Sequence, residues 1–142
     1  MKKILLFAFV LFAFITAKAQ CDDLFFSEYV EGSSQNKALE IYNPTDEAID
    51  LSDYIIRRYR NGAASFDNEL DLVGTIAAGD VFIITNGQIT ANQYGAVDTV
   101  LYEMADMHGT GNHDDSPMYF NGNDALTLEK KNGQIVDIFA HI

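Results

Sequence analysis

Two histidines and two aspartates lie within one short segment and are the clearest candidates for metal ligands. They are His108, His113, Asp114 and Asp115. Imidazole nitrogens bind transition metals, and carboxylate oxygens together with backbone carbonyls bind calcium. Two glycines loosen this segment, so it lacks the fixed helical face that makes a His-Glu-x-x-His motif specific. The pattern favours a solvated polar loop; if a metal binds, calcium at Asp114 and Asp115 is preferred to zinc.

Three glutamates form a second candidate site. Glu28 and Glu31 lie in one predicted strand and Glu40 in the next, so Glu28 and Glu40 approach each other if these strands pair. Paired carboxylates can catalyse hydrolysis when their surroundings separate their pKa values. However, the sequence has no tryptophan, no aromatic run suited to binding sugars, and no Gly-x-Ser-x-Gly motif for a nucleophilic serine. We therefore predict carboxylates that face solvent or accept backbone amides, in a protein that is not an enzyme.

Arg57, Arg58 and Arg60 form the one basic cluster of the sequence. Side chains alternate between the two faces of a strand, so Arg57 and Arg58 cannot share a face. We interpret the cluster as part of an edge strand that forms salt bridges.

Short strands must position all these side chains, because turn residues recur at close intervals and β-rich runs lie between them. The runs predicted as strands are 24–31, 38–43, 49–51, 54–59, 66–73, 81–85, 97–104, 125–130 and 135–139. Such a series, with almost no helical periodicity, predicts an all-β fold, either a β-sandwich or a barrel. Since no linker divides the chain, we predict a single domain over residues 20–142.

Some of these elements carry more specific predictions. Asn61-Gly62 and Asn132-Gly133 are typical of tight hairpins. Residues 81–85 form an unbroken apolar run, which predicts a strand buried on both sides. The one helical candidate is a short segment at residues 90–94.

The N-terminus predicts export from the cell. Lys2 and Lys3 precede an apolar run over residues 4–15, and small residues follow before Gln20. This order is that of a signal peptide, and the run is shorter than the roughly 20 residues that a membrane span needs. We assign residues 1–19 to the signal peptide and expect a secreted protein. Cys21 raises a lipoprotein alternative, but the residues before it fit lipoprotein processing poorly.

Charge narrows the range of partners. Removal of residues 1–19 leaves 6 basic and 21 acidic side chains, a net charge of −15. Such a surface repels nucleic acid and anionic membranes, so we expect neither as a partner. The single cysteine cannot form an intrachain disulfide, and stability must therefore come from packing.

Five segments between Asp23 and Phe139 carry a more specific resemblance. The opening segments are Phe26-Ser27-Glu28-Tyr29-Val30-Glu31-Gly32-Ser33-Ser34 and Asn36-Lys37-Ala38-Leu39-Glu40-Ile41-Tyr42-Asn43. The later ones are Asp50-Leu51-Ser52-Asp53-Tyr54, Ala78-Gly79-Asp80-Val81 and Asn121-Gly122-Asn123-Asp124-Ala125. In this order they resemble the lamin tail domains of secreted bacterial proteins, and the opening segments are the most specific.

The resemblance implies an immunoglobulin-like β-sandwich without catalytic residues, which mediates contact with a protein or a cell surface. Family members continue past the strand at 135–139 into a segment that contains tryptophan, whereas this chain stops at Ile142. We therefore expect a sandwich that lacks its last strand, in a truncated chain or in the first module of a longer protein. Two alternatives stay open, an accessory module of a secreted nuclease or phosphatase and a calcium-dependent binding domain.

Overall fold

The computed structural model describes residues 21–141, and the signal peptide predicted at residues 1–19 lies outside this range. The longer strands are β1 (Phe25–Glu31), β2 (Lys37–Tyr42), β4 (Tyr54–Tyr59), β5 (Asn68–Asp71), β7 (Val81–Thr85), β9 (Ala125–Lys130) and β10 (Ile135–Phe139). Three strands have two residues each, β3 (Ile49–Asp50), β6 (Thr75–Ile76) and β8 (Met107–His108). The helical elements are α2 (Thr99–Glu103) and the 3-10 turns η1 (Leu51–Asp53), η2 (Arg60–Gly62) and η3 (Pro117–Tyr119).

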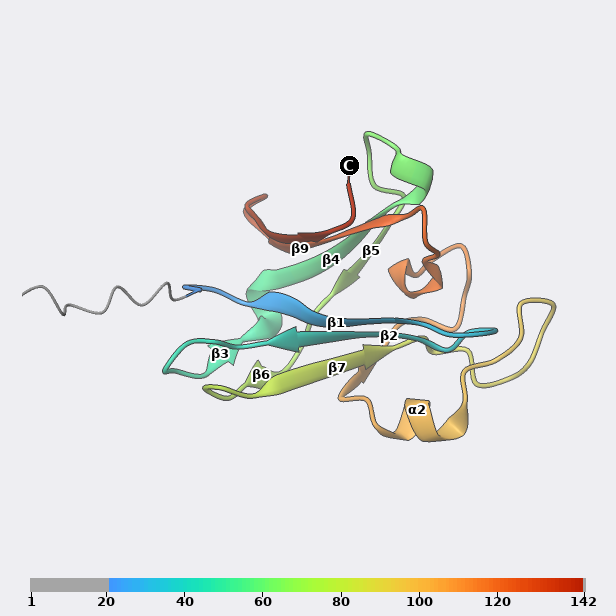
Figure 1. Cartoon of the computed structure of the whole chain (residues 1–142), viewed down its shortest axis with the longest axis horizontal. Coiled ribbons are helices and arrows are strands. Elements are labelled where there is room, and N and C mark those ends of the chain that lie inside the picture. Colours follow the sequence, from blue (N-terminus) through green and yellow to red (C-terminus); the bar gives the residue numbers. More distant parts are fainter. Residues whose placement is uncertain (1–20, 142) are drawn as a thin grey trace, which may run out of the picture.

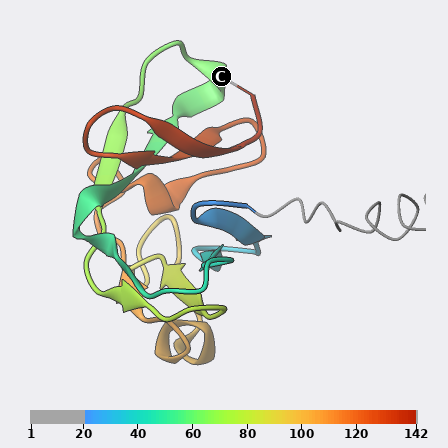
Figure 2. The same cartoon turned by 90° about the vertical axis from the view of Figure 1, so that its left-hand side faces the viewer.

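Eight of the ten strands in residues 21–141 form two four-stranded sheets that lie one over the other (Figure 1, Figure 2), and β3 and β6 pair as a separate two-stranded sheet. We call the sheet with strand order β1-β2-β7-β8 sheet A, and the sheet with order β10-β9-β4-β5 sheet C. All pairings within them are antiparallel except β7 with β8. The chain reaches β8 by crossing the outside of sheet A through α2, as a parallel neighbour requires a long connection.

The core lies between the two sheets and is contributed by alternate residues of both. Leu39 and Ile41 of β2 and Ile84 of β7 face Ile56 of β4 and Leu128 of β9, and all five are fully buried. This alternation is why one face of each strand is apolar. The prediction of an all-β sandwich is confirmed.

Strands β1 and β10, each at the edge of its sheet, join the two sheets along one side. The rings of Tyr29 and Phe139 stack with 4.0 Å between their centroids. The backbone N–H of Phe26 donates to the Asp137 carboxylate over 2.8 Å. Strand β1 also contains a β-bulge at Ser27, since Phe26 pairs with Ile41 but Glu28 pairs with Glu40.

The hairpin predicted at Asn132-Gly133 joins β9 to β10, and Gly133 has the positive φ of 90° that favours glycine in such turns. The prediction at Asn61-Gly62 is only partly correct. Strands β4 and β5 do pair, but in a register that places Arg58 opposite Asn68. A long connection that includes η2 therefore replaces the tight turn.

The helix prediction is wrong in its position. Residues 90–94 contain no helix, whereas α2 lies within the segment 97–104 that was expected to be extended. The helix begins there because the Asp98 side chain accepts a hydrogen bond from the Val100 N–H, the usual role of an N-cap aspartate. Within residues 21–141 no helix is both long and apolar enough to cross a membrane.

Candidate functional site

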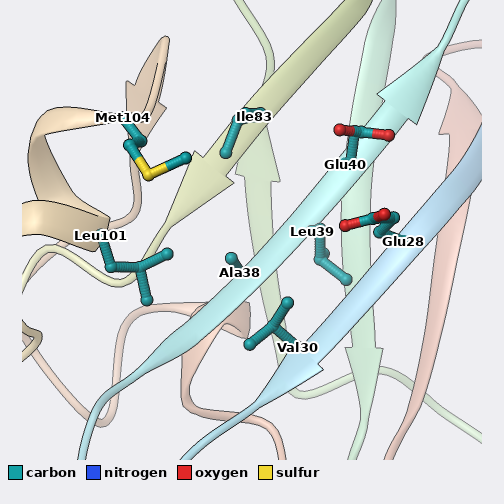
Figure 3. Close-up of a pocket in the computed structure, with 8 residues that line it drawn as sticks. All are labelled: Glu28, Val30, Ala38, Leu39, Glu40, Ile83, Leu101 and Met104. Atoms are coloured by element: carbon teal, nitrogen blue, oxygen red, sulfur yellow. The ribbon is translucent and has the colours of Figure 1, made fainter.

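An open groove lies on the outer face of sheet A, between the strands and α2 (Figure 3). Ala38 of β2 and Ile83 of β7 lie at its centre, and Val30 of β1 lines it beside them. Leu101 and Met104, from α2 and the residue after it, form the opposite side. The groove has a volume of about 170 Å³, smaller than the roughly 300–1,000 Å³ of a typical small-molecule site.

Strand alternation and the position of α2 together create this groove. Ala38 and Ile83 point away from the core because their neighbours Leu39 and Ile84 point into it. The prediction that residues 81–85 are buried on both sides is therefore wrong. Val81 is exposed and Ile83 only half-buried, since α2 covers the outer face incompletely.

Apolar side chains remain accessible along the groove. Met104 is 61% exposed and Val30 is 38% exposed. Exposed apolar side chains that gather beside a shaped surface are typical of interaction sites, whereas isolated ones are common on any protein. The sequence contained a signal for α2, which forms one side of the groove. Asp98 is a typical N-cap residue, and Leu101 and Met104 are three residues apart, as on one face of a helix.

Two carboxylates border the groove on the side away from α2 (Figure 3). Glu28 and Glu40 lie directly opposite each other on β1 and β2, which confirms the prediction that they approach across the sheet. The hydroxyl of Ser27 donates to Glu40 Oε1 over 2.7 Å. Neither carboxylate forms an ion pair with any Lys, Arg or His of residues 21–141.

Glu31, the third predicted glutamate, belongs to a different set of contacts. It lies opposite Lys37 in the sheet, with 3.6 Å between Lys37 Nζ and Glu31 Oε1. It also accepts a hydrogen bond of 2.9 Å from the Tyr29 hydroxyl. Burial, helped by this carboxylate, raises the pKa of Tyr29 well above its usual value, so the phenol stays a hydrogen-bond donor.

The four predicted metal ligands are distributed over separate contacts. His108 lies in β8, where its ring stacks on Tyr102 and its Nδ1 is 3.0 Å from Thr85 Oγ1. Burial lowers the pKa of His108. His113 stacks on Tyr94, and its Nδ1 is 3.1 Å from the carboxylate of Asp114.

Asp115 makes its contact through the backbone, because its carbonyl oxygen accepts a hydrogen bond from the Thr110 hydroxyl. Within residues 21–141 no group of three or more His, Cys, Asp or Glu side chains has the arrangement of a metal site. Calcium binding by Asp114 and Asp115 stays a prediction.

The outer face of sheet C carries Arg57, the first residue of the predicted arginine cluster, and its charge is paired. Arg57 Nη1 lies 2.6 Å from Glu129 Oε2, and Arg57 Nε lies 3.1 Å from Glu69 Oε2. The guanidinium also stacks against the ring of Phe66. Glu129, although on an outer face, is only 3% exposed, and it also accepts from Thr127.

Arg58 and Arg60 share a second acidic partner. Arg58 points to the other face and is buried, and both arginines bond Asp67. The predicted salt bridges are confirmed. The predicted edge position is wrong, since β4 lies between β9 and β5.

The fold and these surfaces define an immunoglobulin-like β-sandwich. The family model of the lamin tail domain matches residues 17–142, and the chain belongs to this family. Its domains are non-catalytic and immunoglobulin-like. A comparison with curated proteins gave no match.

Proposed function

We propose that this protein is a secreted, non-catalytic module that attaches to another protein through the groove on the outer face of sheet A. The groove carries the proposal, because it leaves Val30 and Met104 accessible beside a shaped surface. A protein partner suits it better than a drug-sized molecule, since the groove has room for only one or a few side chains. The signal peptide predicted at residues 1–19 supports a role outside the cell.

Site-specific photocrosslinking in the producing cells tests this function. A photoreactive leucine analogue replaces Leu101 in the groove or, as the control, Val73, an exposed apolar residue outside the groove lining. We expect a discrete adduct with a cell-surface or secreted protein from position 101 and none from position 73. Equal labelling at both positions, or no adduct from either, would contradict the proposal.

Turnover assays address the non-catalytic part of the proposal. The purified protein is incubated with nuclease, phosphatase and glycosidase substrates, with and without divalent cations. We expect no turnover above background. Robust turnover that is lost on substitution of Glu28, Glu40, His108 or Asp114 would contradict it.

A further inference from the structure

We infer that the Glu28–Glu40 pair makes the groove select a protein segment with a cationic side chain two residues away from an aliphatic one. This inference rests on the proposed function, because it names the chemistry of the partner at the same groove. It follows from the charge of the pair, from the spacing along the strands, and from the bonding capacity that the two carboxylates retain.

The charge of the pair is not balanced within residues 21–141. Like charges directly opposite on neighbouring strands repel each other, whereas opposite charges there attract. The same two strands contain both cases, since Glu31 lies opposite Lys37 while Glu28 lies opposite Glu40. A cationic side chain from a partner would relieve the repulsion between Glu28 and Glu40.

The spacing of the groove matches an extended segment. Glu28 and Val30 lie two residues apart on β1, as do Glu40 and Ala38 on β2, and all four line the groove. Two residues of a strand span about 6.6–6.8 Å. A partner chain extended along these strands therefore places the side chains of residues i and i+2 over the carboxylates and over the apolar part, respectively.

The carboxylates retain the acceptors that such a cation needs. The one hydrogen bond described at the pair is that from Ser27 to the Glu40 side chain. The planar guanidinium of arginine offers several donors to two carboxylates at once, so arginine suits the pair better than lysine. Leu101 and Met104 then pack on the aliphatic residue.

A peptide array provides the test. Random octapeptides are probed with the purified protein at about 0.15 M salt, where unspecific attraction by the acidic surface is screened beyond about 8 Å. We expect the retained peptides to be enriched in arginine or lysine two residues from leucine, isoleucine, valine or methionine. The best peptide is then titrated by fluorescence polarisation, together with a version in which citrulline replaces the arginine.

Two matched variants separate the pair from general charge. Glu28→Gln/Glu40→Gln removes the pair, and Asp46→Asn/Glu47→Gln removes the same charge from an exposed turn. We expect the first variant and the citrulline peptide each to weaken binding at least about tenfold, and the second variant to change it less than about twofold. Thermal unfolding of each variant verifies that it is folded.

The possible outcomes distinguish the two proposals. The peptides are also tested on a Met104→Ser variant. If a peptide binds this variant more weakly than the wild type, but binds Glu28→Gln/Glu40→Gln as well as the wild type, the inference is overturned and the proposed function stands. If no peptide depends on Met104, both proposals fail. Binding that requires added calcium would assign the pair to a bridging cation and would also overturn the inference.

Discussion

On the outer face of sheet C, Arg57 is bonded to both Glu69 and Glu129. On the outer face of sheet A, Glu28 faces Glu40, and no Lys, Arg or His of residues 21–141 forms an ion pair with either. The first arrangement is covered by Phe66, and the second borders an open groove. Removal of one member of a buried ion pair is costly, because it leaves the other charge buried without a partner. Accessible charges that have no partner within the chain contribute little to folding and remain available to another molecule. Substitutions at the two faces should therefore differ in size and in sign.

The largest effect is expected for Arg57→Ala. This substitution leaves Glu129, which is 3% exposed, without its cation, and should lower the free energy of unfolding by about 3 kcal/mol. Urea unfolding monitored by circular dichroism measures the change. The double variant Arg57→Met/Glu129→Leu removes both charges and should recover most of the loss. A cost below about 1 kcal/mol for Arg57→Ala would show that the two faces do not differ as described.

Asp67→Asn should have a smaller and pH-dependent effect. Burial alone would raise the pKa of Asp67, but the hydrogen bond and charge of Arg58 and the charge of Arg60 outweigh it and hold the pKa below its usual value. The stabilisation is therefore present above the unfolded pKa of about 3.9 and is lost as the pH falls through the lower folded pKa.

At pH 7 we expect Asp67→Asn to cost about 1.5 kcal/mol, because Arg58 is buried and loses a charged partner. Urea unfolding of the wild type and of this variant between pH 7 and pH 3 should show a constant difference above about pH 5 that becomes smaller as the pH falls further. A difference that persists unchanged at the lowest pH would contradict this account.

Glu31→Gln should cost less. It removes the charge opposite Lys37 but keeps an acceptor for the Tyr29 hydroxyl, so the expected loss is about 0.5 kcal/mol. Thermal unfolding at low salt measures it, and high salt should reduce it. A salt-independent loss would mean that the Glu31–Lys37 attraction is not its cause.

Glu28→Gln should have the smallest effect and the opposite sign. Removal of one of two opposed like charges should stabilise the protein by about 0.3 kcal/mol. The same thermal unfolding series measures it beside Glu31→Gln, on the same strand. A clear loss of stability would show that Glu28 has a structural role, and the contrast between the two faces would then be wrong.

The strand pattern was predictable because it depends on local signals. Gly133 in its turn and the alternation around Leu39 and Ile41 determine a hairpin and a buried face within a few residues. The pairing of Glu28 with Glu40 also followed once the first two strands were taken as neighbours. These predictions required no knowledge of how the sheets pack.

The groove could not be predicted in this way. Its apolar wall depends on α2, whose crossing over the outside of sheet A is a tertiary feature that overrides the weak extended preference of residues 97–104. Ile83 therefore appeared as a core residue, because a continuous apolar run does not show which face stays open. Likewise, the central position of β4 depends on β9, more than sixty residues later, and no local signal around Arg57 reports it.

The bulge at Ser27 has a further consequence for the face of the sheet to which each half of β1 directs its side chains. A residue gained or lost within a regular strand turns every later side chain to the other face. Here the bulge takes up one extra residue, so Phe26 keeps its bond to Asp137 while Glu28 and Val30 keep their places opposite Glu40 and Ala38. Without the bulge, Phe26 and Glu28 would lie on the same face of the sheet; with it, Phe26 stays opposite Ile41 of the core while Glu28 is directed to the outer face.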